Sequence, residues 1–146
     1  MQVEVRRART SDIKAIRALV DTYTADRRLL SKATVTLYEQ VQEFWVAADA
    51  ETGRVVGCGA LHVMWEDLAE IRTVAVDPQW RGRKIGHRIV AELIGVAREL
   101  GVARVFCLTF ETRFFGSFGF VEIDGAAVPH NVYEQLLRSY DEGVAE

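Results

Sequence analysis

Apolar positions in the first half of the chain change repeatedly between strand-like and helix-like spacing. Strict alternation and short apolar runs predict strands, whereas apolar residues three or four positions apart predict helices. The predicted elements are, in order, a strand at residues 3–7, a helix at 13–23 after cap candidates at 10–12, a short helix at 35–41, and strands at 44–48, 55–63 and from Ala69 onward. The last three strands are separated by short turns, which indicates an antiparallel meander.

The strongest signal in the second half is a helix at residues 85–100. Its apolar residues recur every three or four positions, and Gly101 follows as a C-terminal cap. Residues 104–110 are almost entirely apolar, as in a strand covered on both faces. Strand, helix and strand in this order form a right-handed parallel crossover. The remaining predicted elements are a short helix at 114–118, a strand at 120–123 and a helix at 132–140.

The fold class that follows is α/β, or α+β in some schemes, with a mixed, mostly antiparallel central sheet flanked by helices. The 146 residues, 49% hydrophobic and 27% charged, fit one soluble globular domain over residues 1–146. The net charge of −3 is spread along the chain, so neither nucleic acid nor a membrane surface is an expected partner. No apolar run approaches the roughly 20 residues of a membrane span.

The cysteines and histidines carry no metal or disulfide signature. Cys58 and Cys107 lie in apolar, strand-like runs without a C-x-x-C spacing, which is typical of buried free cysteines. His62 is expected to be a core residue, and no trio of histidines and acids has metal-ligand spacing, so we predict no metal. A reducing cytoplasm is the expected compartment.

A basic loop stands out against this acidic background. After the strand that ends at Val76, residues 80–88 carry four arginines and lysines and one histidine at the start of the long helix. Positive side chains at a helix N-terminus oppose the helix macrodipole, so they are best explained by a bound polyanion. Ordinary surface charge is the alternative.

This loop, the meander, the crossover and a Phe-Gly-Phe at residues 118–120 together resemble the acetyl-CoA-dependent N-acetyltransferases of the GNAT superfamily, over nearly the whole chain. The resemblance implies that acetyl-CoA is a co-substrate, with its pyrophosphate on the loop amides and its pantetheine arm along the preceding strand. The implied cofactor-binding residues are Val74, Ala75, Val76, Arg81, Gly82, Arg83, Lys84, Ile85, Gly86 and His87.

Lys84 departs from the family loop, because a glycine is usual at its position. If this residue must adopt a positive φ, a lysine costs on the order of 1 kcal/mol. The loop is therefore expected either to be reshaped or to use Lys84 as an additional phosphate contact.

A closer resemblance is to the acetyltransferase domain of bacterial N-acetylglutamate synthases, especially the short stand-alone forms. It rests on four segments, which are residues 29–32, 57–61, 70–78 and 105–109. It implies acetyl transfer to the α-amino group of L-glutamate in arginine biosynthesis. Many GNAT enzymes have a tyrosine as general acid where this chain has Phe115, but the aromatic pair Phe114-Phe115 agrees with the synthases.

Two carboxylates are candidates for the general base. Glu70 begins the strand before the cofactor loop, at a frequent position of the family's base, although a solvated turn acid would have the same sequence context. Glu111 is the rival, because it follows the C-terminal end of the parallel strand, where open α/β sheets place ligands. Either could deprotonate the acceptor ammonium directly or through water.

Glutamate has two carboxylates, so its site needs cationic groups and hydrogen-bond donors. Lys32 lies in a polar, basic loop at a position where the synthases carry a basic residue, and Arg72 shares the strand face of Glu70. Thr109 and Arg113 complete the predicted substrate contacts. Surface charge is the alternative for Lys32, and burial against an acid is the alternative for Arg72.

Two other functions remain open at this point. The chain could acetylate another amine, such as a protein N-terminus or a polyamine, or it could bind acyl-CoA as a sensor without turnover. GNAT folds usually continue into one more strand, which this chain is expected to lack. An unpaired sheet edge then predicts a shortened family member or a two-fold homodimer.

Overall fold

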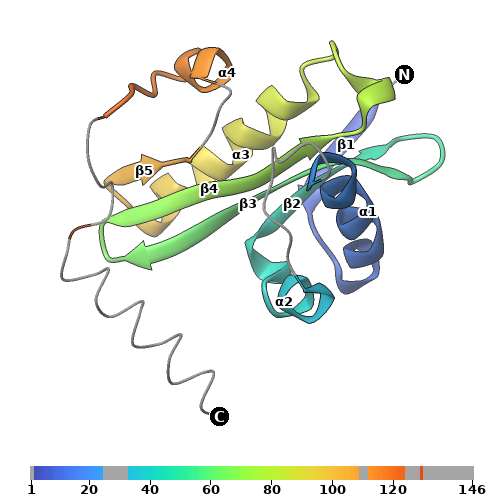
Figure 1. The fold of residues 1–146 in the computed structure, drawn as a ribbon, viewed down its shortest axis with the longest axis horizontal. Coiled ribbons are helices and arrows are strands. Elements are labelled where there is room, and N and C mark those ends of the chain that lie inside the picture. Colours follow the sequence, from blue (N-terminus) through green and yellow to red (C-terminus); the bar gives the residue numbers. More distant parts are fainter. Residues whose placement is uncertain (1, 25–32, 109–111, 124–128, 130–146) are drawn as a thin grey trace.

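The computed structural model describes residues 2–24, 33–108, 112–123 and 129. They form a five-stranded sheet in the order β1-β2-β3-β4-β5, with helices on both sides (Figure 1). Neighbouring strands are antiparallel except β4 and β5, which are parallel. The elements are β1 (Val3–Arg7), α1 (Ile13–Thr24), α2 (Thr34–Glu39), β2 (Phe44–Asp49), β3 (Val55–Trp65), β4 (Leu68–Val76), α3 (Ile85–Leu100), β5 (Arg104–Phe106) and α4 (Thr112–Gly116).

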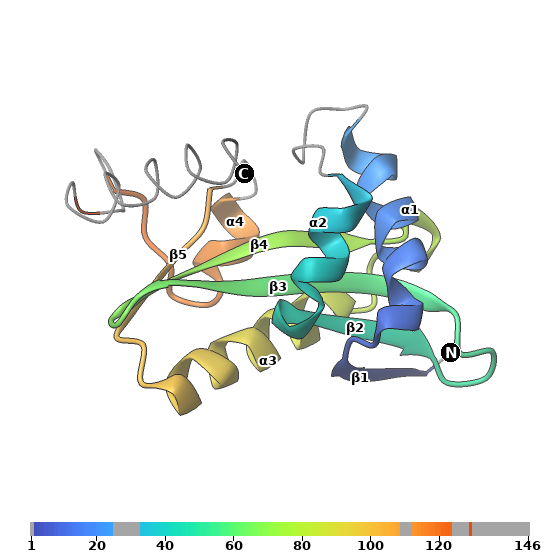
Figure 2. The ribbon, with the colours of Figure 1, turned by 90° about the horizontal axis from the view of Figure 1, so that it is seen from below.

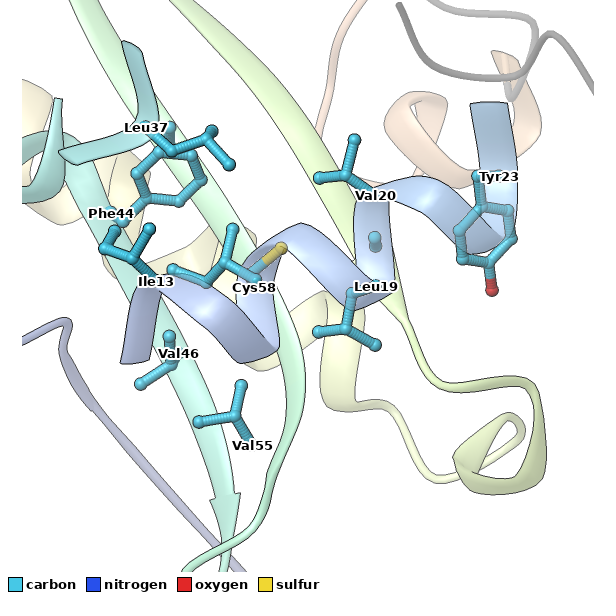
Figure 3. Packing of buried hydrophobic residues seen from close by; sticks show 12 residues of the cluster. Ile13, Leu19, Val20, Tyr23, Leu37, Phe44, Val46, Val55 and Cys58 are labelled. Atoms are coloured by element: carbon cyan, nitrogen blue, oxygen red, sulfur yellow. The ribbon is translucent and has the colours of Figure 1, made fainter. Parts of the chain in front are cut away.

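Two apolar clusters lie on opposite faces of this sheet. α1 and α2 cover one face, and α3 covers the other (Figure 2). On the first face Ile13, Leu19 and Val20 of α1 gather with Phe44 and Cys58 of the sheet (Figure 3). α1 and α3 therefore bury most of the apolar stripe that their residue spacing predicts, because burial of that stripe stabilises the helix on the sheet. In α2 only Leu37 is buried.

Two glycines of β3 bring α3 close to the sheet. A Cβ atom at Gly59 would lie 2.8 Å from Cγ2 of Ile89, and one at Gly57 would lie 3.0 Å from side-chain atoms of both Ile85 and Ile89. Any side chain at these positions would push the helix away. The N-terminal half of α3 is therefore held directly against the middle of the sheet.

Several sequence predictions are confirmed to the residue. β1 and α3 have the predicted bounds, and Gly101 ends α3 in the left-handed conformation at φ 80°. The meander and the parallel crossover are also present. Within the described residues, no helix combines the length and the apolar character needed to cross a bilayer.

Two predicted strands differ from the structure. The strand predicted at residues 104–110 is wrong in its length, because β5 ends at Phe106 and Leu108 is 81% exposed. The strand predicted at residues 120–123 is wrong, because these residues have no regular structure and Val121 and Ile123 are exposed. In both places the apolar residues lack a neighbouring strand among the described residues. The predicted helix at 132–140 lies outside the part of the chain that the structure describes.

Candidate active site

A cleft opens where β4 and β5 separate. Its volume is about 680 Å³, and it is lined by residues 71–76 of β4, by the loop and first turn of α3, by residues after β5, by α4 and by Tyr23 of α1. Parallel pairing of the two strands is confined to residues 68–70 of β4 and 104–106 of β5. The cleft therefore lies beside the part of β4 that β5 does not cover.

The floor of this cleft is an open strand edge. Beyond Glu70, the backbone of β4 has no strand partner on the β5 side among the described residues. Unpaired N–H and C=O groups of this kind can accept an extended ligand as an additional strand. The geometry is suited to a linear, amide-containing chain lying along β4.

A bulge interrupts β4 in the middle of this edge. Cys58 pairs with Ala75 while Ala60 pairs with Arg72, so β4 contains one residue more than β3 over this stretch. Thr73 in the bulge has φ 60°, which is an uncommon conformation for a β-branched residue. Bulges change the direction of the backbone and often occur next to active sites. Here the bulge lies within the part of β4 that lines the cleft.

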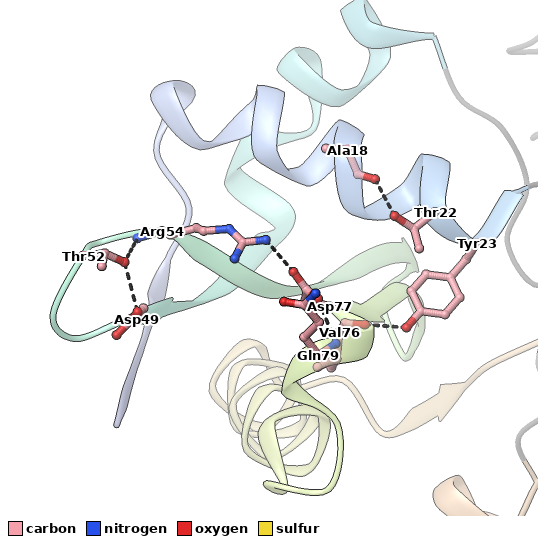
Figure 4. A network of polar contacts seen from close by, with 9 residues as sticks. All are labelled: Ala18, Thr22, Tyr23, Asp49, Thr52, Arg54, Val76, Asp77 and Gln79. Carbon is pink, nitrogen blue, oxygen red and sulfur yellow. Dashed lines mark hydrogen bonds and ion pairs between the residues drawn. The ribbon is translucent and has the colours of Figure 1, made fainter. Parts of the chain in front are cut away.

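The C-terminal end of β4 is held by a polar network (Figure 4). The hydroxyl of Tyr23 donates a hydrogen bond to the carbonyl of Val76, and Nη2 of Arg81 lies 3.0 Å from the same hydroxyl. Asp77 accepts from the Gln79 amide at 2.9 Å and from Nη2 of Arg54 at 2.6 Å. The basic loop thus leaves the sheet in a defined direction. Tyr23 was not predicted as a site residue, because its helical spacing indicates only a core position.

The start of α3 is built to receive an anion. Lys84 occupies the N-cap position at φ 60°, so the positive φ considered for this residue is present, and no side chain caps the helix there. The amides of the first helical turn have no partner within the helix and carry the positive end of its dipole. Because Arg81 and His87 also line the cleft, a phosphate group has both amide donors and cations available.

Aromatic side chains of α4 and of the turn that follows it cover this helix start. The ring of Phe114 lies 4.7 Å from that of His87, centroid to centroid, and the ring of Phe118 lies 5.3 Å from it. A Cβ atom at Gly86 would lie 3.3 Å from the Phe114 ring. Gly86 therefore leaves room both for the aromatic wall and for a ligand that approaches the amides.

A charged cluster lies at the inner end of the cleft. His62 and Glu70 are paired across β3 and β4, and Nη1 of Arg72 lies 3.7 Å from Oε1 of Glu70. Oε1 of Glu43 lies 2.9 Å from Nδ1 of His62 and 3.8 Å from Nη2 of Arg72. His62 was predicted to be a core residue with its hydrogen bonds satisfied. Its ring does bond to Glu43, but the core placement is wrong, because the side chain is 27% exposed. Glu43 precedes β2 and was not predicted, since only the register of three strands brings it to this cluster.

The predicted site residues fall into three groups. Those that line the cleft are Arg72, Val74, Ala75, Val76, Arg81, Gly82, Lys84, Ile85, Gly86 and His87. Three others do not line it: Glu70 lies behind Arg72 with its side chain 13% exposed, Arg83 lies over the ring of Trp80, and Arg113 is exposed on α4. Lys32, Thr109 and Glu111 lie outside the described residues. Within the described residues, no three histidine, cysteine or acidic side chains are grouped as a metal site would require.

We expect Cys107, which lines the cleft, to react slowly with iodoacetamide at neutral pH. Partial burial, together with the negative charge of Glu70, raises the pKa of Cys107 to about 11. Because the thiolate is the reactive form, the labelling rate should increase about tenfold per pH unit between pH 7 and 10. Cys58 is fully buried and should not contribute. Peptide mass spectrometry measures the rates, and labelling at pH 7 as fast as that of a free thiol would contradict the assignment.

The topology, the open strand edge and the anion site at a helix start together define a transferase that uses an acyl-CoA. Residues 13–120 match the acetyltransferase (GNAT) family, and the chain belongs to this family. The resemblance seen in the sequence is thereby confirmed, and so is the predicted fold class.

Three similar proteins indicate which acetyltransferases this chain resembles. An amino-acid acetyltransferase of Mycobacterium tuberculosis is 62% identical over 97% of this chain and 82% of its own length. A crystal structure from the same organism, in complex with CoA and NLQ, has a TM-score of 0.88 at 62% identity and covers 97% of this chain and 86% of that one. The N-acetylglutamate synthase of Neisseria gonorrhoeae, complexed with coenzyme A and N-acetyl-glutamate, has a TM-score of 0.82 at 28% identity over 95% of this chain and 33% of that one.

Proposed function

We propose that this acetyltransferase transfers the acetyl group of acetyl-CoA to the α-amino group of L-glutamate. The observation that carries the proposal is that the cleft and the charged cluster meet. A CoA-sized cleft along β4 ends at a cluster that combines a carboxylate, Glu70, with a guanidinium, Arg72. The 62% identical relative is named an amino-acid acetyltransferase, which supports an amino acid as the acceptor.

Acetyl-CoA is proposed to bind along the open edge of β4. Its pyrophosphate would contact the amides of residues 82–87 with Arg81 and Lys84, and its pantetheine amides would pair with the backbone of Val74 and Val76. The thioester would then lie near the bulge at Thr73. A backbone N–H turned toward the cleft there would stabilise the oxyanion that develops on the thioester carbonyl.

The chemical step in this proposal is direct attack. Glu70, or Glu111 as the rival base, takes a proton from the acceptor ammonium, and the neutral nitrogen attacks the thioester carbonyl. The C–N bond forms, the C–S bond breaks, and CoA leaves as a thiolate. Phe115 has no proton to give, so the second proton, which the nitrogen loses as the C–S bond breaks, reaches the leaving thiolate through water. The carboxylates of glutamate would be held by Arg72 together with Lys32, Thr109 and Arg113.

The biological setting is part of the same proposal. We propose that this acetylation of glutamate serves as the first step of arginine biosynthesis and takes place in the cytoplasm. A two-fold homodimer stays a prediction from the sequence, because the C-terminal segment on which it depends lies beyond the described residues.

Thiol release from acetyl-CoA tests the proposal. We expect CoA to be released when L-glutamate is added, and more slowly with glutamine, aspartate or a peptide with a free N-terminus. Preference for the peptide would favour the alternative acceptor. Binding of acetyl-CoA without thiol release in the presence of any of these amines would favour a sensor.

A further inference from the structure

Glu43 is the carboxylate on which two side chains of the charged cluster, His62 and Arg72, converge. A single oxygen, Oε1, lies 2.9 Å from Nδ1 of His62 and 3.8 Å from Nη2 of Arg72. Glu43 ends a short 3-10 turn (Val41–Glu43) and does not line the cleft. It can act on a bound acceptor only through the side chains that it holds.

Arg72 lies between two carboxylates without pairing closely with either one. Its distances to Glu43 and Glu70, 3.8 Å and 3.7 Å, are too long for hydrogen bonds. Its buried Nε has no hydrogen-bond partner among the described residues. A guanidinium has five N–H donors and normally forms a bidentate pair with a neighbouring carboxylate. The donors of Arg72 are therefore under-used, although the residue lines the cleft.

We propose that Glu43, held by His62, is a positioning residue that keeps Arg72 from closing onto Glu70. This inference rests on the proposed function, in which Glu70 is the base and Arg72 holds a carboxylate of the acceptor. The two roles conflict, because a bidentate Arg72–Glu70 pair would occupy both the lone pairs of the base and the donors of the anchor. A second carboxylate at Nη2, the other terminal nitrogen of the guanidinium, removes the conflict because it competes with Glu70 for Arg72.

The titratable and charged groups around Glu70 come from four elements. Arg72 lies on β4, His62 on β3, Glu43 on the turn before β2, and the Cys107 thiol follows β5. Cys107 stays neutral at physiological pH, so the electrostatic environment of Glu70 is set by the other three groups. Removing the charge of Glu43 leaves Glu70 as the one carboxylate within 4 Å of the Arg72 guanidinium among the described residues.

Glu43→Gln is the test variant, because it keeps the shape of the side chain and removes its charge. With Arg72 drawn to Glu70, the acidic limb of the pH profile of kcat should move to lower pH by about half a unit or more. The KM for glutamate should rise roughly fivefold, while the KM for acetyl-CoA stays within about twofold of the wild-type value. Glu43→Asp, which restores the charge, should recover part of both changes.

Three further variants show whether the changes seen in Glu43→Gln are specific to Glu43 and its contacts. Asp21→Asn removes a carboxylate from an exposed helix ion pair with Arg17 and should leave the pH profile unchanged. In an Arg72→Gln background, Glu43→Gln should have no additional effect on the acidic limb, since the guanidinium through which it acts is gone. If Glu43→Gln does not fold, His62→Asn removes the other partner of Glu43 and should shift the profile in the same direction.

The outcomes separate this inference from the proposed function. A wild-type protein without glutamate-dependent turnover would overturn both. An active wild type whose Glu43→Gln and His62→Asn variants keep the acidic limb and the KM for glutamate would overturn the positioning role alone. Equal increases in the two KM values would show that Glu43 is merely structural.

Discussion

Replacing Glu70 by glutamine is expected to lower kcat about 100-fold or more while the affinity for acetyl-CoA stays within about twofold. Glutamine keeps the shape of the side chain but cannot accept a proton from the ammonium. Glu70 does not line the cleft, so its loss should not disturb CoA contacts. Steady-state kinetics with glutamate give kcat, and calorimetry gives the acetyl-CoA affinity.

The matched control for Glu70 is Glu66→Gln. Glu66 is an exposed carboxylate in the turn before β4, so its replacement removes the same charge outside the cluster. Its kcat should equal that of the wild type. If Glu70→Gln keeps a rate within about twofold of wild type across neutral pH, the base role is contradicted and Glu111 becomes the candidate.

Gly86→Asp should weaken acetyl-CoA binding by about 100-fold or more. The new Cβ atom would lie 3.3 Å from the ring of Phe114, which would have to shift, and the carboxylate would place a negative charge at the anion site. The steric contact and the added charge both act on the first turn of α3. Isothermal titration of acetyl-CoA into the folded variant measures the loss.

Gly95→Asp is the control for this helix. Gly95 also lies in α3, but a Cβ atom there would have nothing within 4 Å, so the substitution adds the same charge and tests the cost to the helix. Gly86→Ala separates the steric effect from the effect of the added charge, because the new Cβ atom contacts the Phe114 ring without adding a carboxylate. Unchanged acetyl-CoA affinity in a folded Gly86→Asp protein would show that the cofactor site is misplaced.

Most of the fold could be predicted because its elements follow local periodicity. The apolar stripe of α3 and its glycine cap lie within one continuous segment, and so do the basic residues at its start. The length of β5 could not be predicted in this way, since a strand extends only as far as its partner accompanies it. Residues 107 and 108 are apolar, but β4 and β5 have already separated there.

The residues of the candidate site also differ in whether local sequence could predict their placement. Arg81, Gly86 and Lys84 belong to one loop, so their joint placement follows from sequence order. Glu43 and His62 are brought to Arg72 by the registers of β2 on β3 and of β3 on β4. A shift of one residue in either register would turn these side chains to the opposite face. The residue pattern within a single strand does not determine how that strand is aligned with its neighbours.

The separation of β4 from β5 also bears on aggregation. An unpaired strand edge is a template on which other polypeptides can add, and proteins usually cover or charge such edges. Here the open edge of β4 is the floor of a cleft whose walls include α4 and the basic loop, so that an added polypeptide would have to enter between these walls. The opposite edge, β1, carries the exposed Arg7, and its charge discourages the addition of another strand. The described part of the sheet thus offers the unpaired backbone of β4 inside a cleft and places a charge on its outer edge at β1.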